Sequence, residues 1–440
     1  MRHDVVIVGA GLAGLACARD LIGAGTDVVV VEARDRPGGR VEGATLADGR
    51  TVQMGGELVG TVHHAYRGLV AELGLELERS YVDEPGEDAW DLVDGVRMGE
   101  GWLTAAEGAS LERAESRMVA LAGTIDPASP WSHPDAARLD RMSVGDLLRD
   151  CGVSGNAFRM VQAQARSAGA GSVERLGVLG LLRGAAAGEG HLLSDYAAWE
   201  DMRLVGGSSL LVDTLSGQVG ERLRLGCPVV AIGVGSPCAV ELLGGDRIEA
   251  EAVVCAVPVG PLRDIRLTGV SDARLRSLRA QREVPAYKAV VAFEGPVWRG
   301  HDWSGLCASE HQIGGFWPQS DSALSSLLGP EQIGYLLAET PEMRDAHIAA
   351  ALERLVGAVE PIDVLWREWG TDPFTRGYVS HWAPGDVLAT GPLHGTHEPP
   401  FYVCGSDQWV CGYMEGAVRT GRGAAAAVTG QRAGVTTLDA

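Results

Sequence analysis

The amino-terminal segment combines an apolar run, a glycine-rich turn and a helical pattern. Val5 to Val8 form a continuous apolar run, which is typical of a parallel strand that is buried on both faces. Apolar positions from Leu12 to Ile22 then recur with the spacing of a helix. A second apolar run ends at Glu32 and predicts another buried strand. This order of strand, turn, helix and strand predicts an α/β fold.

The rest of the chain mixes predicted helices and strands. The stretch from Arg138 to Gly188 carries helical periodicity, whereas "VVAFEGPVW" (290–298) and "QIGYLLAET" (332–340) predict strands. Asp94-Gly95 predicts the turn of a hairpin, and Ser271 is suited to cap the helix that follows it. We therefore expect a second, α+β region that contains a sheet and a helical part.

Length and composition narrow the class of protein. A chain of 440 residues exceeds the roughly 250–300 residues at which one core stops growing, so two domains with a cleft are expected. The formal net charge of −21 disfavours nucleic acid and anionic membranes as partners. No apolar run approaches the ~20 residues that span a membrane, and a strand begins at once, so we expect a cytoplasmic protein. Eight cysteines without paired spacing predict buried apolar side chains and no metal site.

The glycine turn carries a dinucleotide-binding pattern. Gly9, Gly11 and Gly14 form GxGxxG, in which the first glycine permits the turn, the second admits a pyrophosphate and the third lets helix and strand pack. The helix amino terminus offers free N–H groups to phosphates. Glu32 stands where a carboxylate accepts hydrogen bonds from a ribose. Further glycine pairs, in "ARDRPGGR" with Arg34 and Arg40 and in "TVQMGGELVG", favour FAD over the smaller NAD.

Lys288 is the only lysine of the chain, whereas 36 of the 37 basic residues are arginines. At ordinary frequencies roughly twenty or more lysines would occur, so arginine serves wherever a solvated positive charge suffices. The retained lysine therefore marks either a chance survivor on a surface strand or a place where a guanidinium fails.

The ordered motifs resemble the flavin-containing monoamine oxidase family along nearly the whole chain. The segments that carry the resemblance are "GAGLAGL", "VVEARDRPGGR", "MGGELVG", "AYKAVVAFEGPVW" and "YVCGSDQWVCGYMEGAVRTGRGAAAAV". The resemblance implies a Rossmann-like FAD-binding domain of the GR2 type. It also implies that Val229 turns its backbone toward the adenine and that a helix beginning at Tyr413 points at the flavin. The expected cofactor-binding residues are Gly9, Gly11, Leu12, Ala13, Gly14, Glu32, Ala33, Arg34, Gly39, Arg40, Gly55, Gly56, Glu57, Leu58, Val229, Gly405, Asp407, Tyr413 and Met414.

The same resemblance implies catalytic residues. Lys288 corresponds to a lysine that reaches the flavin's reactive nitrogen through a water, and Tyr378 and Tyr413 to two rings that flank the substrate nitrogen. Gly377 stands where the best-known members have a cysteine bonded to the flavin, so the FAD is expected to be non-covalent. Glu57 departs from the usual small or neutral residue. It would pair with a cationic amine or take a proton from an N–H group, or else be turned away into solvent.

The segment that precedes the second part of the FAD-binding domain, which begins at residue 205, is predicted to form a wall of the substrate site. Its candidates are Gly188, Gly190, His191, Tyr196 and Trp199, with Trp317 further along the chain. The family layout predicts an FAD-binding domain from residues 1–78, 205–284 and 386–432. It predicts a substrate domain from residues 79–204 and 285–385, followed by a tail at 433–440.

These features predict an FAD-dependent oxidase of a carbon–nitrogen bond. Hydride would pass from the carbon next to nitrogen to the flavin, leaving an imine, and O2 would be reduced to H2O2. The substrate would be an amine, or an amine or amide of secondary metabolism, and the chain could form a homodimer. An L-amino acid oxidase, a flavin desaturase and a flavoprotein that only binds remain alternatives.

Overall fold

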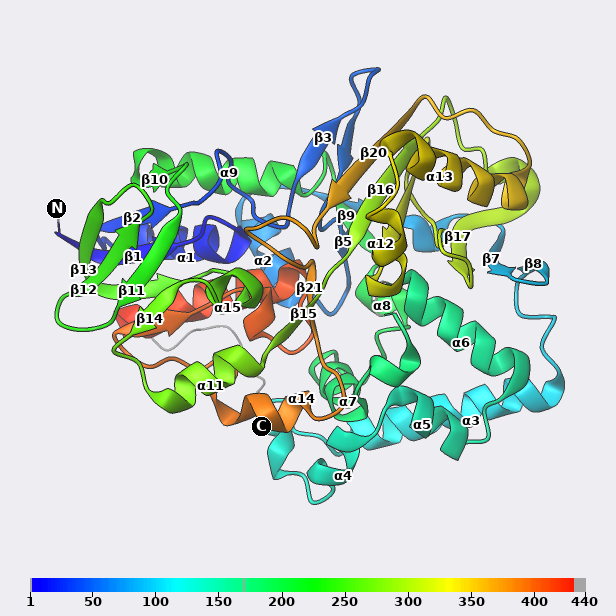
Figure 1. Cartoon of the computed structure of the whole chain (residues 1–440), viewed down its shortest axis with the longest axis horizontal. Helices are drawn as coiled ribbons and strands as arrows, with labels where there is room; N and C mark the ends of the chain where they lie inside the picture. Colours follow the sequence, from blue (N-terminus) through cyan, green and yellow to red (C-terminus); the bar gives the residue numbers. More distant parts are fainter. Residues whose placement is uncertain (1, 169–170, 431–440) are drawn as a thin grey trace.

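The largest sheet is built mainly from parallel strands. The computed structural model describes residues 2–168 and 171–430, so the predicted tail at 433–440 lies outside the described residues. Within them this sheet has eight strands, seven of which follow the order β10-β2-β1-β13-β12-β11-β14 (Figure 1). The eighth, β22, pairs with β13. Only β12 runs antiparallel to its neighbours. The strands are β1 Arg2–Val8, β2 Val28–Val31, β10 Leu223–Arg224, β11 Val229–Gly233, β12 Cys238–Leu242, β13 Arg247–Cys255, β14 Arg266–Thr268 and β22 Phe401–Val403.

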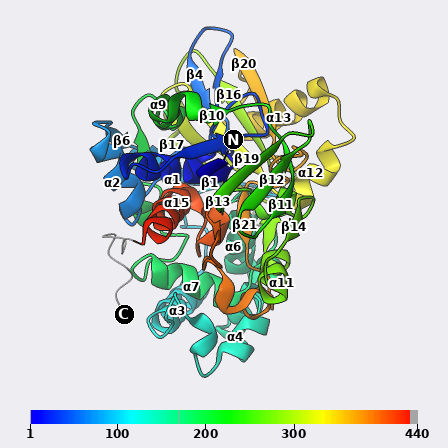
Figure 2. The ribbon, with the colours of Figure 1, turned by 90° about the vertical axis from the view of Figure 1, so that its left-hand side faces the viewer.

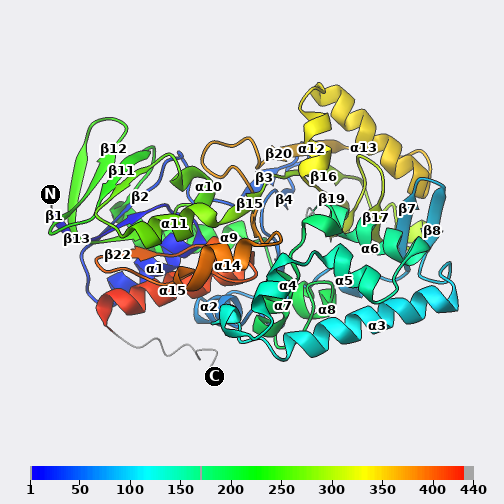
Figure 3. The ribbon, with the colours of Figure 1, turned by 60° about the horizontal axis from the view of Figure 1, so that its bottom comes forward.

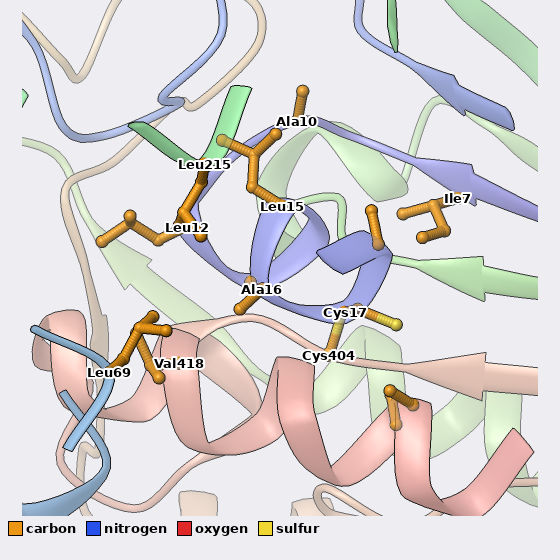
Figure 4. Close-up of a cluster of buried hydrophobic side chains, with 14 of the residues drawn as sticks. Ile7, Ala10, Leu12, Leu15, Ala16, Cys17, Leu69, Leu215, Cys404 and Val418 are labelled. Atoms are coloured by element: carbon orange, nitrogen blue, oxygen red, sulfur yellow. The ribbon is translucent and has the colours of Figure 1, made fainter. Parts of the chain in front are cut away.

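The core of this region forms around the predicted first strand and helix, both of which are confirmed. Val5 to Val8 pair residue by residue with Val28 to Val31, and all eight side chains are buried. Helix α1 (Leu12–Gly23) packs against α15 (Tyr413–Thr429) and α9 (Ser209–Val219), and α2 (His64–Glu72) packs against α15 in the same core (Figure 4). Figure 2 shows α15 next to α1, with β1 and β13 side by side. A Cβ atom on Gly421 would lie 2.2 Å from the Ala13 carbonyl oxygen, so glycine lets α15 approach α1.

A second sheet has β16 among its central strands. Within the described residues its order is β18-β19-β16-β20, and β16 pairs antiparallel with both neighbours. One face of β16, with Tyr287, packs against helices α12 and α13, and the other, with Val290, packs against Met54. The bounds are β16 Tyr287–Ala292, β18 Trp317–Ser320, β19 Ala323–Leu328, β20 Asp363–Glu368, α12 Pro330–Leu336 and α13 Pro341–Val356.

The predicted strand at 332–340 is wrong, because most of this segment belongs to helix α12 or to the turn after it. Pro330 occupies the first turn of α12, where a missing N–H costs nothing. The Gln332 side chain accepts a hydrogen bond from the Gly329 N–H at 2.7 Å and caps the helix start. Ile333 and Leu336, three residues apart, face the core. Short apolar runs fit a strand or a helix, and here the helix start signals decide.

The helical region between residues 105 and 187 confirms the periodicity from Arg138 to Gly188. Helices α3 to α7 gather on one side of the molecule, away from β1 (Figure 3). Leu147, Leu179 and Leu182 lie at the centre of their shared core. The helices are α3 Ala105–Ala122, α4 Ala136–Arg141, α5 Val144–Asp150, α6 Gly155–Ser167 and α7 Val178–Ala187.

Smaller elements connect these regions. The antiparallel pair β7 and β8 confirms the predicted hairpin, although its turn is Val93-Asp94, one residue before the predicted Asp94-Gly95. The Ser271 hydroxyl accepts the Arg274 N–H at 3.1 Å, which confirms the predicted cap. The remaining elements are β3 Gly43–Thr45, β4 Thr51–Gln53, β5 Leu58–Val59, β6 Leu77–Arg79, β7 Glu87–Leu92, β8 Gly95–Met98, β9 Met202–Leu204, β15 Arg282–Val284, β17 Trp303–Ser309, β21 Val379–His381, α8 Tyr196–Trp199, α10 Val259–Leu262, α11 Asp272–Ala280 and α14 Asp386–Thr390.

The structure tests the predictions that the cysteines are buried and that no segment is apolar enough to span a membrane. Cys17, Cys238, Cys255, Cys307, Cys404 and Cys411 are buried, and none of the eight cysteines forms a disulfide. This agrees with the prediction that most of them are buried apolar residues. Among residues 2–168 and 171–430, every helix is too short or too polar to cross a bilayer.

Candidate active site

Lys288 is the second residue of β16 and lies on the strand face toward the loop that contains Gly55 and Gly56. Side chains alternate between the faces of a strand, so Lys288 shares its face with Val290. Val290 packs in one buried cluster with Met54, which precedes Gly55 in the chain. The Lys288 ammonium therefore reaches this loop. It donates hydrogen bonds to the Gly55 carbonyl oxygen at 3.1 Å and to the Glu57 carboxylate at 2.8 Å.

Glu57 is a buried carboxylate with several donors. Besides Lys288, the side-chain amide of Gln319 donates to it at 2.6 Å, the indole N–H of Trp317 donates to it, and the Ser325 hydroxyl lies 3.5 Å away. Only 7% of Glu57 is exposed. A buried charge needs a partner of opposite sign, and Lys288 supplies it within the chain. Glu57 is therefore not turned away into solvent.

Tyr413 begins α15 in a strained conformation. Its φ is 54°, a left-handed value that bulky residues rarely adopt and that costs about 1–3 kcal/mol. The ring stacks on Trp199 with centroids 5.5 Å apart and also contacts His63 at 4.8 Å. The hydroxyl donates to the Glu200 carboxylate at 3.2 Å. The strain and these contacts fix the ring at the start of the helix.

Tyr378 approaches from the segment before β21. Its backbone N–H donates to the Val284 carbonyl oxygen at 3.0 Å, which ties it to the end of β15. Its hydroxyl donates to the Ala168 carbonyl oxygen at 2.7 Å. Burial raises the pKa of the Tyr378 hydroxyl, and the negative charge of Glu200 raises it further. Tyr378 and Tyr413 thus both lie near Glu200, although they are 35 positions apart.

Glu200 is a site residue that the sequence analysis missed. It follows α8 and precedes β9, and its carboxylate accepts hydrogen bonds from Tyr81 at 2.7 Å and from Tyr413. Burial raises its pKa, which the two hydroxyl donors partly offset. Its position directly after the predicted wall residues Tyr196 and Trp199 was the available signal. Nothing else in the sequence separates it from the other acidic residues.

The glycine turn forms the far end of the site. Gly9 has a φ of 103°, and a Cβ atom on Gly14 would lie 2.0 Å from the Gly9 carbonyl oxygen, so both positions require glycine. Gly11 is the N-cap of α1 and has no side chain to cover the first N–H groups of the helix. The Glu32 carboxylate accepts the N–H of Ala10 at 2.8 Å and is buried beside them.

Two arginines hold loops together at this end. Arg34 donates to Asp372 at 2.6 Å. Arg40 donates to the Asp407 carboxylate and to the Ser406 hydroxyl, both at 2.8 Å. Asp407 also accepts the Val259 N–H at 3.3 Å. The Asp407 carboxylate is therefore committed to protein donors, and the backbone before it forms the neighbouring surface.

One continuous cavity of about 980 Å³ connects the glycine turn to the tyrosines. It extends into a chamber that the apolar side chains of Leu111, Met118, Met160 and Leu181 line from the helical region. Of the predicted site residues, Gly14 and Asp407 do not line it. Those that do are Gly9, Gly11, Leu12, Ala13, Glu32, Ala33, Arg34, Gly39, Arg40, Gly55, Gly56, Glu57, Leu58, Val229, Lys288, Tyr378, Gly405, Tyr413 and Met414.

The predicted substrate wall is found only in part. Tyr196 and Trp317 line the cavity. Trp199 is fully buried and supports Tyr413 from behind. Gly188, Gly190 and His191 are outside the cavity lining, so their assignment to the wall is wrong. The cavity thus has a glycine-rich cradle at one end, a lysine–carboxylate pair in the middle and a tyrosine-lined chamber at the other end.

Comparison with known proteins identifies a family to which the chain is similar along nearly its whole length. The model of the flavin containing amine oxidoreductases matches residues 12–429. Putrescine oxidase of Kocuria rosea is 29% identical over 98% of this chain and 96% of its own. Flavin-containing amine oxidase B of Bos taurus is 25% identical over 96% of this chain and 85% of its own. A solved structure of putrescine oxidase bound to putrescine superimposes with a TM-score of 0.89, at 27% identity and 98% coverage of this chain and 100% of the other.

The match spans far more than half of the chain, begins directly after Gly11 and includes the lysine strand and the last helix. It confirms the predicted flavin cofactor, the α/β fold and an oxidoreductase that acts on amines. Together with the cavity, these findings assign the chain to the flavin-containing amine oxidoreductase family.

Proposed function

We propose that this chain oxidises an amine to an imine, with FAD held without a covalent bond and O2 reduced to H2O2. A single observation carries the proposal: the cavity that begins at the glycine cradle continues past Lys288 to Tyr378 and Tyr413. A dinucleotide that starts at Gly11 would therefore end next to the lysine and the tyrosines. The flavin would supply acceptance of a hydride equivalent from the carbon next to nitrogen, and its transfer to oxygen.

The residues of the cavity fit an FAD. The N–H groups at the start of α1 are free for a pyrophosphate, and Glu32 borders the position of a ribose. The start of α15 lines the end of the cavity opposite the glycine turn, and the partial positive charge of this helix end favours a reduced, anionic flavin ring. Gly55 and Gly56 border the space between these two helix ends. We propose that these groups bind the cofactor.

Gly377 supports a non-covalent flavin. A Cβ atom at this position would lie 2.6 Å from the Glu283 Cβ atom and 3.0 Å from the Val284 carbonyl oxygen. A cysteine side chain could not be accommodated here without a shift of β15.

Lys288 is proposed to hold a water at the flavin. An ammonium has three N–H donors, and Gly55 and Glu57 use two of them. The third is free for a water, because Lys288 lines the cavity. Glu57 would act as a positioning residue that fixes the ammonium. Arginine would place a planar fork in the same space and could not make this set of contacts.

The charges of the cavity favour an amine over an amino acid. An L-amino acid oxidase needs an arginine for the substrate carboxylate. In the part of the chain that the structure describes, the cavity-lining arginines are Arg34, Arg40 and Arg376, and each pairs with an aspartate. Putrescine oxidase, the relative named above, acts on an amine by its name. A secondary-metabolite substrate belongs to the proposal as well, supported by the unusual Glu57 and the lysine-poor composition.

The observed pairings also support the proposed division into two discontinuous domains. All strands of the eight-stranded sheet come from residues 1–78, 205–284 and 386–432. Helices α3 to α7 and the sheet around β16 come from residues 79–204 and 285–385. The cavity is lined by both sets. We therefore keep this division as part of the proposal.

The test is anaerobic mixing of the FAD-loaded protein with amines, L-amino acids and amides. We expect amines to bleach the yellow flavin, and we expect air to restore the colour with release of peroxide. Reduction by amino acids alone would favour the amino acid oxidase. A flavin that no amine reduces would contradict the proposal and favour a binding protein or a desaturase.

A further inference from the structure

Glu200 is an acidic side chain in the chamber that the resemblance did not mark. It lines the cavity, and its two carboxylate oxygens accept hydrogen bonds from Tyr81 and Tyr413, which come from different parts of the chain. These hydroxyls fix the carboxylate but leave its charge in place. Within residues 2–168 and 171–430, the side-chain donors to this carboxylate are the two tyrosine hydroxyls, and no arginine, lysine or histidine forms an ion pair with it. Lys288, the only lysine of the chain, forms its ion pair with Glu57.

Four tyrosines surround this carboxylate. Tyr81, Tyr196, Tyr378 and Tyr413 all line the cavity. Tyr81 and Tyr413 contact the carboxylate directly, and the Tyr196 ring lies 6.3 Å from the Tyr81 ring. Burial raises the pKa of each of the four hydroxyls, and the negative charge of Glu200 raises each further. Aromatic rings attract cations through their faces, and a carboxylate among them adds a full opposite charge. This combination is suited to an ammonium group.

The proton balance of amine oxidation gives this carboxylate a second task. An alkyl amine is an ammonium at neutral pH, but it must have a free electron pair on nitrogen when the neighbouring C–H bond breaks. One N–H proton must therefore leave first. Burial raises the pKa of Glu200, and the charge of Glu57 adds to the rise, whereas the hydroxyls of Tyr81 and Tyr413 and the charge of Lys288 lower it. A carboxylate with a raised pKa holds a transferred proton more firmly.

We propose that Glu200 binds the ammonium nitrogen of the substrate and accepts the proton that this nitrogen must lose. One N–H bond breaks, one O–H bond forms on Glu200, and the neutral amine keeps the electron pair. This inference rests on the proposed amine oxidation and goes beyond it, because it names a cationic amine rather than a neutral amide as the substrate class. Glu57 is unsuited to the task, since Lys288 already neutralises it.

The direct test is a comparison of two ligands that cannot be oxidised. The amine 2-phenylpropan-2-amine has no hydrogen on the carbon next to nitrogen, and 2-phenylpropan-2-ol is its neutral counterpart. Both are titrated into the FAD-loaded protein, and the flavin absorbance gives the dissociation constants. In Glu200→Gln we expect the amine to bind roughly 10- to 100-fold more weakly, the loss typical of a charged hydrogen bond. We expect the alcohol to bind as it does to the unchanged protein.

A kinetic measurement adds a signature that a structural role would not give. Without Glu200 the substrate must arrive as the free base, so the pH at which kcat/KM is highest should move upward in Glu200→Gln. Asp213→Asn, on the exposed side of α9, removes one negative charge outside the cavity lining and should change neither measurement. Tyr81→Phe removes one hydroxyl that fixes the carboxylate and should give a smaller loss of amine affinity.

Each outcome decides between the two proposals. If amines reduce the flavin of the unchanged protein but Glu200→Gln keeps its preference for the amine ligand, the role of Glu200 is refuted while amine oxidation stands. If no amine reduces the flavin, the proposed function itself fails. If Glu200→Gln does not retain FAD, two other experiments replace it. One uses Glu200→Asp, and the other measures how the ratio of amine affinity to alcohol affinity depends on pH in the unchanged protein. A ratio that stays constant across the titration of Glu200 would equally refute the inference.

Discussion

The Lys288 ammonium and the Glu57 carboxylate are 2.8 Å apart, and less than a tenth of each side chain is exposed. They come from positions 231 residues apart, one from a central strand of a four-stranded sheet and one from a glycine loop. The only lysine of the chain and the unusual acid of the flavin loop are therefore partners. Each explains why the other is tolerated inside the protein.

The buried pair predicts non-additive effects on stability. Removing one partner leaves an uncompensated buried charge, which costs about 3–5 kcal/mol of unfolding free energy. We expect Lys288→Met and Glu57→Gln each to lose stability in this range, and the double variant to lose less than the sum. Urea unfolding of the four proteins forms a double-mutant cycle. The exposed pair Arg2–Glu251 is the control, because Glu251→Gln should cost less than about 1 kcal/mol. Additive losses for Lys288 and Glu57 would contradict the prediction.

Lys288→Met should also slow the chemistry. If the third N–H of the ammonium holds a water at the flavin, its loss should slow flavin reduction, reoxidation by O2, or both, by at least roughly tenfold. Stopped-flow absorbance measures the two half-reactions separately. Lys288→Arg keeps the charge and should not restore either rate. Unchanged rates in both half-reactions of Lys288→Met would show that the lysine has only a structural role.

The sequence predicted individual residues of this site better than the contacts between them. The glycine turn could be predicted because a positive φ at Gly9 and the close approach at Gly14 are local demands on single residues. The pairing of Lys288 with Glu57 could not, because it depends on which face of β16 packs on the loop. Glu200 was missed because it is one of 58 acidic residues, and only the folded chain brings Tyr81 and Tyr413 to it.

Two glycines of helix α1 should respond in opposite ways to alanine. A Cβ atom on Gly14 would meet the Gly9 carbonyl oxygen at 2.0 Å, whereas one on Gly23 meets nothing within 4 Å. We expect Gly14→Ala to lower stability by about 1–3 kcal/mol and to weaken FAD retention, because helix and turn must separate. Gly23→Ala should be neutral or stabilise by up to about 1 kcal/mol. Thermal unfolding and the flavin-to-protein absorbance ratio measure both effects, and equal behaviour of the two variants would be inconsistent with this packing.

Denaturation should release the flavin completely. Gly377 leaves no space for a cysteine side chain, so no covalent bond is expected at that position. After acid or heat precipitation the yellow colour should appear in the supernatant, and the pellet should carry none. Gly377→Cys should lose stability rather than gain a bound flavin, because its Cβ atom would meet β15. Colour that stays with the precipitated protein would disprove the non-covalent assignment.

Glu283 should make stability depend on pH. Burial raises the pKa of this carboxyl to about 8, and the neighbouring Asp407 adds to the rise while Arg40 opposes it. Between the ordinary glutamate pKa and about 8, the folded protein therefore holds a proton that the unfolded chain has lost. The unfolding free energy should fall as the pH rises through this window, by up to about 1.4 kcal/mol per pH unit. Urea unfolding at pH 5 to 8 should show this slope, and Glu283→Gln should remove it. A slope that persists in Glu283→Gln would assign the dependence to another group.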